Sequence, residues 1–188
     1  LRLPPERNTL FVEALKLLGS TLLLLPALQP DLATLLSPAE PEADFFYNIT
    51  HVQMPRRQRA LARLRARVDG GAFEIPTLSH YLLPLLRALV VRENPNEADV
   101  AEEAVVTLRA VAARLPWRPY LGILQAFSRL LTTRPRLEKR LVRGIVAVID
   151  VFHFEMDAPA DDGDDEAAAD EEAAAEEEEA GEEAGEEV

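Results

Sequence analysis

Apolar residues recur at helical spacing along most of the chain. In the segment 55–68, Leu61, Leu64 and Val68 fall on one stripe, because helical residues three and four apart share a face. Pro55 can begin this helix, since the N–H that proline lacks would have no intrahelical partner in the first turn. A Gly-Gly pair follows and ends the pattern. The segment is therefore expected to be an amphipathic helix with one buried side.

Prolines punctuate the helical patterns at a regular interval. Pro55, Pro95 and Pro135 are 40 residues apart, and Pro76 and Pro116 have the same separation. Each stands at the start of a helical pattern, where proline is tolerated. Helix pairs that repeat at roughly 40 residues are typical of HEAT and armadillo solenoids. The sequence predicts an all-α fold, an α-solenoid of HEAT or armadillo type with stacked antiparallel helix pairs.

The remaining helices follow from the same periodicity and from capping residues. They are expected at residues 9–25, 31–36, 43–51 and 76–92, and from about 95, 116 and 135 onward. Three parts of the chain result: N-terminal helices with a Pro-rich linker at 1–42, helical repeats at 43–156 and an acidic segment at 157–188.

Several burial expectations accompany these helices. Leu78, Leu82, Leu85 and Leu89 should line the buried face of the helix at 76–92. The segment 144–154 is apolar nearly all round, which is typical of an inner helix covered on both sides. Within it, Asp150 is expected to be buried and to accept hydrogen bonds.

Charge is distributed unevenly along the chain. The formal net charge is −13. However, 17 of the 33 Asp and Glu residues lie in 157–188, where there is no Lys or Arg, so the rest of the chain carries +4. The acidic segment contains too little apolar surface to offset the entropy of ordering and is expected to be disordered. It could be a solubilising linker, or an electrostatic mimic of nucleic acid that competes for a basic surface.

A second stripe of the helix at 55–68 is strongly basic. Arg56, Arg59, Arg63 and Arg67 follow one another at spacings of three or four residues, and Arg57 is a weaker member at the helix start. Like charges this close repel, so an anion such as RNA phosphate would stabilise them. The alternative is a solvated basic face whose arginine stems lie over apolar surface.

Three stretches, in order, resemble one known family. They are Asp44-Phe45-Phe46 with His51-Val52-Gln53, Arg56-Arg57 and Arg59-Ala60-Leu61; then Leu115 to Tyr120, with Trp117 and Tyr120; then Val151-Phe152-His153-Phe154-Glu155. The chain is similar over residues 44–156 to a long nucleolar HEAT-repeat family, the U-three small nucleolar RNA-associated scaffold of the small-subunit processome, also called the down-regulated-in-metastasis family.

The resemblance implies a non-catalytic scaffold in the nucleus and nucleolus that supports processing of precursor ribosomal RNA. Its implied partners are pre-ribosomal RNA or small nucleolar RNA and other ribosome-assembly proteins. The alternative is a HEAT or armadillo adaptor in transport or trafficking that binds only proteins. The two differ in whether RNA binding exists and depends on salt.

Other chemistry finds little support in the sequence. The chain has no Cys, which removes thiol nucleophiles and cysteine-based metal sites. His51, His80 and His153 lack the spacing of a helical metal site. No arrangement typical of an enzyme, cofactor or small-molecule site occurs, and no apolar run is long enough for a membrane span. Trp117 and Tyr120 could stack on bases but are expected in the core, beside neighbouring leucines.

Deleting residues 157–188 is expected to leave the thermal midpoint of the remainder nearly unchanged, because the segment offers no apolar contacts to a core. If the segment shields the basic stripe, the same deletion strengthens RNA binding. Calorimetry and a binding titration on the two lengths check both effects. Strong amide-exchange protection of the segment at neutral pH would contradict the expected disorder.

Overall fold

The computed structural model describes residues 5–155, and side chains from residue 10 onward. Throughout this range the secondary structure is helical and contains no strand. Contacts divide the chain into two units, Leu1–His153 and Phe154–Val188. Only Phe154 and Glu155 of the second unit are described, so the expected disorder of 157–188 lies outside the described residues.

Long helices in the first unit are joined by short helical turns. The elements are α1 (Pro5–Leu24), η1 (Pro26–Leu28), α2 (Pro30–Ala33), α3 (Phe45–Ile49), α4 (Met54–Asp69), α5 (Ile75–Thr77), the π-helical turn η2 (Leu78–Leu82), α6 (Leu83–Val90), η3 (Pro95–Glu97), α7 (Ala98–Ala112), α8 (Trp117–Thr133), η4 (Pro135–Leu137) and α9 (Glu138–Ile149). The helix starts expected at the five periodic prolines are confirmed within one or two residues.

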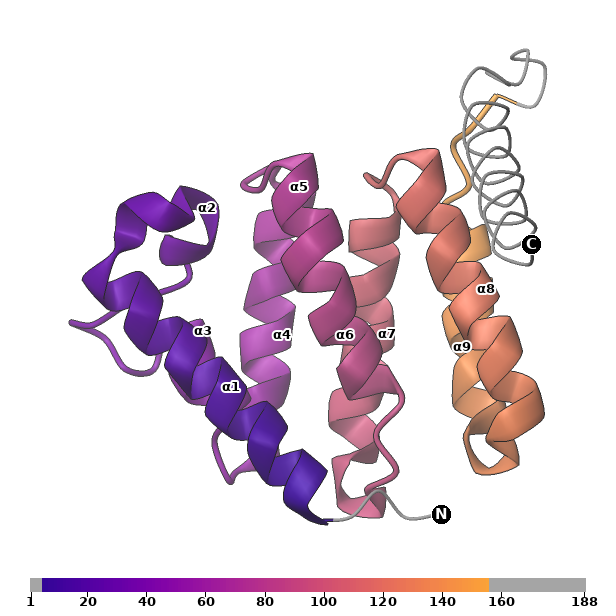
Figure 1. The fold of residues 1–188 in the computed structure, drawn as a ribbon, viewed down its shortest axis with the longest axis horizontal. Helices are drawn as coiled ribbons and strands as arrows, with labels where there is room; N and C mark the ends of the chain where they lie inside the picture. The colour runs from indigo at the N-terminus through magenta and orange to yellow at the C-terminus, as the bar shows by residue number, and fades with distance from the viewer. Residues whose placement is uncertain (1–4, 156–188) are drawn as a thin grey trace, which may run out of the picture. The chain divides into compact units, whose positions relative to one another are not determined.

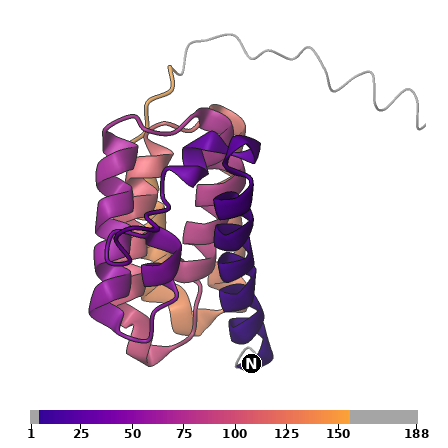
Figure 2. The same cartoon turned by 90° about the vertical axis from the view of Figure 1, so that its left-hand side faces the viewer.

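The helices of the first unit form two layers (Figures 1 and 2). In one layer α7 packs between α4 and α9. The other layer contains α1, the continuous run α5–η2–α6, and α8. The two layers meet where α6 packs on α7 and α8 packs on α9. From α4 onward, consecutive long helices run in alternate directions (Figure 1).

The core lies between these layers. In α4, the stripe of Leu61, Leu64 and Val68 is at most 1% exposed, as expected. The stripe of α7 is buried in the same way. Its members are Ala101, Ala104, Val105, Leu108, Val111 and, just beyond the helix, Leu115.

The π-helical turn corrects one expected stripe. Leu78 and Leu82 are buried as predicted, but Leu85 is only half-buried and Leu86 is fully buried. A π turn contains one residue more than an α turn, so every later side chain is rotated relative to an uninterrupted α-helix. The turn ends two residues before Pro84, which lacks the N–H that an α-helical hydrogen bond would need.

The outer helices bury less than expected. The prediction that α9 is covered on both sides is wrong for this unit: Val142, Val146 and Ile149 are 44–54% exposed. Asp150, expected to be buried, is exposed at the C-terminal end of α9. On α1, the exposed leucines are Leu10, Leu17, Leu23 and Leu24.

The contact between α8 and α9 depends on a glycine. A Cβ added at Gly144 of α9 would lie 2.7 Å from Phe127 Cε2, and Phe127 is fully buried. Replacing Gly144 with Ala is expected to destabilise the protein by about 1–3 kcal/mol through overpacking. The better helix propensity of Ala, about 1 kcal/mol, does not offset this effect in full.

Gly122 of α8 is the matched control, because a Cβ there would meet no atom within 4 Å. Gly122→Ala is expected to stabilise by about 0.5–1 kcal/mol through helix propensity alone. Chemical denaturation of the two variants gives the comparison. Equal stabilisation by both would show that α8 and α9 are not held this closely.

Candidate nucleic-acid interface

The direction in which the arginines of α4 point is determined by the apolar side of the same helix. Pro55 stands in its first turn, and Leu61, Leu64 and Val68 turn toward α7 and α3. The arginines therefore occupy the remaining circumference. Of the four expected on one stripe, Arg59 and Arg63 are exposed, and Arg56 and Arg67 are half-buried.

Two of these arginines hold the segment that precedes α3. Arg63 Nη1 donates a hydrogen bond to the main-chain carbonyl of Glu42. Arg67 Nη1 donates to the carbonyl of Thr34, at the C-terminal end of α2, with a separation of 2.5 Å. The Thr34 carbonyl lacks an intrahelical donor because it lies at a helix end, and the Glu42 carbonyl lies in the turn before α3. Both bonds satisfy a neutral acceptor without cancelling the arginine charge.

The other two lie at the start of the helix. Arg59 Nε donates to the Pro55 carbonyl at 3.3 Å. Arg56 Nη2 lies 3.6 Å from a carboxylate oxygen of Glu42, whose side chain is 79% exposed, so this pair is weak. Among the described residues, Arg59, Arg63 and Arg67 have no carboxylate within ion-pair distance. These three charges are left for an external anion.

A small polar depression lies on this face. It has a volume of about 10 Å³, close to that of one water molecule. It is lined by Glu42, Asn48, Arg56, Arg59 and Arg63. Three guanidinium groups against one carboxylate give the depression a positive balance, which suits a phosphate oxygen rather than a cation.

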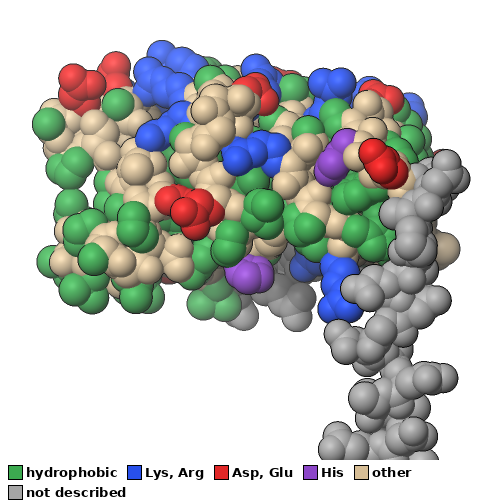
Figure 3. All heavy atoms as spheres, turned by 90° about the horizontal axis from the view of Figure 1, so that it is seen from above, with side chains coloured by type: hydrophobic (Ala, Val, Ile, Leu, Met, Phe, Trp, Pro, Cys, Tyr) green, Lys and Arg blue, Asp and Glu red, His purple; other side chains and the backbone are tan. Residues whose placement is uncertain are grey.

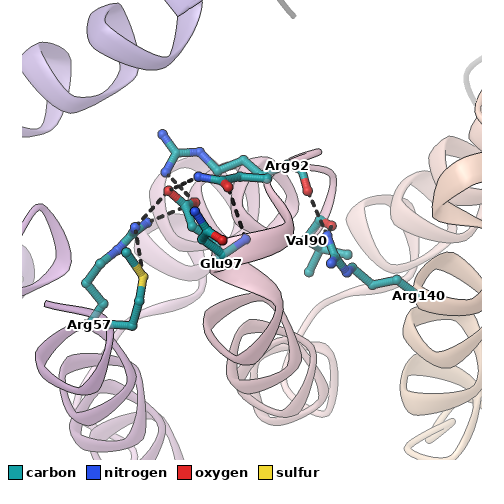
Figure 4. A network of polar contacts seen from close by, with 8 residues as sticks. Arg57, Val90, Arg92, Glu97 and Arg140 are labelled. Carbon is teal, nitrogen blue, oxygen red and sulfur yellow. Dashed lines mark hydrogen bonds and ion pairs between the residues drawn. The ribbon is translucent and has the colours of Figure 1, made fainter. Parts of the chain in front are cut away.

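Arg57 has a different role from its neighbours. It is 5% exposed and turns inward, where its Nη1 lies 2.9 Å from Glu97 Oε1. Arg92 Nη1 meets the other carboxylate oxygen of Glu97 at 3.1 Å, and Asn94 Nδ2 donates to Oε1 at 3.1 Å (Figure 4). Because this ion pair occupies it, Arg57 is removed from the set of RNA-contact candidates.

This buried cluster carries one more positive than negative charge. The pKa of Arg92 is lowered, mainly because the side chain is buried. The positive charge of Arg57 lowers it further, and the negative charge of Glu97 raises it by less than burial lowers it. Burial alone would raise the pKa of Glu97, but its hydrogen bond and charge contact with Arg57 and the charge of Arg92 lower it overall. Arg92 also lies over the ring of Phe11 at 4.5 Å, which ties α1 to the cluster.

The sequence pattern does not reveal this cluster, because Glu97 is already accounted for as part of the Asn-Pro-Asn-Glu pattern that begins a helix. Asn94 does cap the turn, accepting a hydrogen bond from the Asn96 N–H. Arg57 and Glu97 are 40 residues apart, the same interval that separates the periodic prolines. This shared interval is the sequence feature that could have indicated the ion pair.

The second and third matching stretches meet at one end of the unit. Tyr120 is fully buried; its ring packs edge-on against Phe152 and His153, and its hydroxyl donates to the Val148 carbonyl at 2.8 Å. His153 Nε2 lies 3.1 Å from the Leu115 carbonyl. Phe154 belongs to the second unit.

Trp117 departs from the sequence expectation. The prediction of a core position is wrong, because the indole is 47% exposed. It is the first residue of α8, so it projects from the end of the helix, whereas Tyr120, three residues later, turns inward. The two rings are stacked with a centroid separation of 6.3 Å.

The first matching stretch is structural. The Asp44 carboxylate caps α3 by accepting from the Tyr47 N–H at 2.7 Å, and it also accepts from the Ser37 N–H. Phe45 and Phe46 are buried. His51 Nδ1 accepts from the Gln53 N–H at 3.0 Å, just before α4 begins. This stretch therefore sets the position of α4 and of its arginines.

Residues 5–155 contain neither a metal-ligating cluster nor a membrane-spanning helix. In that part of the chain, no three His, Cys, Asp or Glu side chains gather closely enough to hold a metal ion. The helices described there also fall short of the length and apolar character that a bilayer span requires.

Two curated proteins are similar to this chain. The U3 small nucleolar RNA-associated protein 20 of Saccharomyces cerevisiae is 32% identical over 116 residues, 62% of the chain. The protein of the same name from Schizosaccharomyces pombe is 32% identical over 130 residues, 69% of the chain. The matched part is 5% of the length of each relative. No family model matches. The family resemblance inferred from the three stretches is confirmed.

Replacing Glu97 with Gln is expected to destabilise the protein by about 3–5 kcal/mol, because Arg57 and Arg92 would remain as buried cations without a counter-charge. The folded-state pKa of Glu97 is lowered. Its stabilising contribution is therefore complete above the ordinary carboxyl pKa and is lost as the pH falls through the folded value. Denaturation of parent and variant at several pH values measures this difference.

Glu103→Gln provides the control, since Glu103 pairs with Arg65 at 2.8 Å but both side chains are partly exposed. A loss of at most about 1 kcal/mol is expected there. Equal losses for the two variants, or a Glu97 effect that persists unchanged at low pH, would contradict the role of the buried charge.

Proposed function

We propose, because the chain resembles a segment of the U3 small nucleolar RNA-associated protein 20 family, that it is a non-catalytic helical piece of a small-subunit processome scaffold. In this role it supports processing of precursor ribosomal RNA in the nucleolus. Its partners are pre-ribosomal or small nucleolar RNA and other assembly proteins.

The observation that carries the RNA contact is the uncompensated charge of α4. Arg59, Arg63 and Arg67 donate to main-chain carbonyl groups, which satisfy some N–H groups and leave the positive charge in place. Each guanidinium keeps further N–H groups for a phosphate. Contacts of this kind follow the backbone of an RNA and do not identify its bases.

We also propose that the helix pairs are successive turns of an α-solenoid. The support is a recurring separation between charged partners on neighbouring helices or in the turns beside them. Arg57–Glu97, Arg65–Glu103, Arg134–Glu93 and Arg143–Glu102 are 38 to 41 residues apart. Ion pairs that join equivalent positions of adjacent pairs would produce this spacing.

Changing Arg59, Arg63 and Arg67 together to Gln is expected to remove most of the electrostatic RNA affinity. Three phosphate contacts correspond to a log–log salt slope of about −2 for single-stranded RNA, at about 0.7 per contact. In the triple variant the slope should approach zero for every RNA sequence alike. Fluorescence anisotropy of a labelled single-stranded RNA, measured over a series of salt concentrations, gives both quantities.

Arg129→Gln is the matched control, because Arg129 is an exposed arginine on α8, away from this face. It should leave affinity and slope close to those of the parent. Parent-like binding by the triple variant at low salt would mean that the basic face is only solvated. Loss of a protein partner with RNA binding intact would favour the adaptor function instead.

A further inference from the structure

The polar depression beside α4 contains a carboxylate among its arginines. Glu42 lines it together with Asn48, Arg56, Arg59 and Arg63. A carboxylate repels the phosphate groups that the arginines attract, so on its own it weakens a phosphate contact. It favours binding of a nucleic acid only if that ligand also offers a hydrogen-bond donor.

The carboxylate of Glu42 is only loosely paired within the protein. Acidic side chains lie among Lys and Arg side chains along one edge of the surface (Figure 3), but they are not all paired equally closely. Glu103 meets Arg65 at 2.8 Å, whereas a Glu42 oxygen lies 3.6 Å from Arg56 Nη2 and the Glu42 side chain is 79% exposed. Such a long, exposed contact contributes little free energy, so Glu42 can exchange it for a hydrogen bond from a ligand.

The turn that carries Glu42 is held in place by the neighbouring helices. Arg63 Nη1 of α4 donates to the main-chain carbonyl of Glu42 itself. Asn48 Nδ2 of α3 donates to the carbonyl of Pro41 at 2.7 Å. The backbone beside the carboxylate is therefore fixed before any ligand binds, which reduces the entropy that binding would cost.

Asn48 brings an acceptor, not a donor, to the depression. The residue is 5% exposed, and its Nδ2 donates to the carbonyls of Pro41 and Asp44 at 2.7 and 2.6 Å. An amide has two N–H groups, so both are used and the oxygen is the atom left for a ligand. The depression therefore combines arginine donors, which suit a phosphate, with carboxylate and amide acceptors, which suit a hydroxyl.

A nucleic-acid backbone offers few hydrogen-bond donors. Phosphate and ring oxygens only accept, and the ribose 2′-OH is the donor that RNA has and DNA lacks. It lies on the sugar next to a phosphate, so one nucleotide can meet the arginines and the carboxylate at once. The depression, at about 10 Å³, has room for a single oxygen atom, such as a hydroxyl or one phosphate oxygen.

We propose that Glu42 accepts a hydrogen bond from the 2′-OH of a ribose whose neighbouring phosphate lies on Arg59 and Arg63, so that this face distinguishes RNA from DNA. This inference rests on the RNA-binding function proposed above and adds selection for the sugar to it. A DNA strand keeps the phosphate contacts but leaves the carboxylate without a donor. The contact involves no base, so the preference holds for every sequence.

The parent chain is expected to bind a single-stranded RNA about 2- to 13-fold more tightly than the DNA of the same sequence, the range for one hydrogen bond. RNA with 2′-fluoro groups should bind like the DNA, because it keeps the sugar conformation of RNA but has no hydroxyl proton. Fluorescence anisotropy of the three labelled strands, at the same salt concentration, measures these ratios.

Glu42→Ala is expected to bring the ratio of RNA to DNA affinity close to one. Affinity for DNA should not decrease, because a repulsive charge is lost and every arginine remains. Glu42→Gln should keep part of the preference, since its amide oxygen still accepts. Glu40→Ala is the control, because Glu40 is an exposed acid of the same segment that does not line the depression.

This inference and the proposed function fail in different ways. Equal affinity of the parent for the three strands, or a preference that persists in Glu42→Ala, overturns the hydroxyl contact and leaves the phosphate contacts of α4 standing. A preference that follows base sequence and not the sugar also overturns it, because the carboxylate would then contact a base. Absence of RNA binding by the parent chain rejects the proposed function, and this inference with it.

Discussion

Helices end in carbonyl groups that have no donor within the helix, and this protein supplies those donors from a neighbouring helix or from the residues just after it. Arg67 serves the end of α2, Arg114 the end of α4 and Arg140 the end of α6, through the carbonyls of Thr34, Val68 and Val90. His153 lies against the carbonyl of Leu115 after α7. Each helix pair is therefore fastened to the one before it by side chains that also favour the negative end of the helix dipole.

This arrangement would allow the same arginines to have a structural role and the proposed RNA-binding role. A carbonyl oxygen is a neutral acceptor, so the charge of the guanidinium remains after the bond forms. Where a carboxylate is the partner, as for Arg57 and Glu97, the charge is balanced inside the protein and no longer acts outside it. An arginine that donates to a carbonyl can position a helix and still attract phosphate. An arginine that pairs with a carboxylate holds the structure together but no longer attracts an external anion.

Much of the fold could be predicted from the sequence because it follows from local patterns. Proline marked the helix starts, and apolar spacing identified the buried faces of α4 and α7. Leu86 replaced Leu85 in the core because a π-helical turn changes the register, and apolar spacing does not reveal such a turn. The basic face was found from spacing alone. The inward turn of Arg57 depends on Glu97, which is distant in sequence, so local reasoning missed it. The exposure of Trp117 follows from its place as the first residue of α8, which apolar spacing alone does not take into account.

The exposed apolar residues of α1 and α9 have a practical consequence. Leu17 and Leu24 on one helix, and Val146 and Ile149 on the other, offer surface that water solvates poorly. If copies of the chain associate at high concentration, these two surfaces are where contacts unrelated to RNA are expected. A surface charge introduced at Leu24 or Ile149 would improve solubility without touching the arginines of α4.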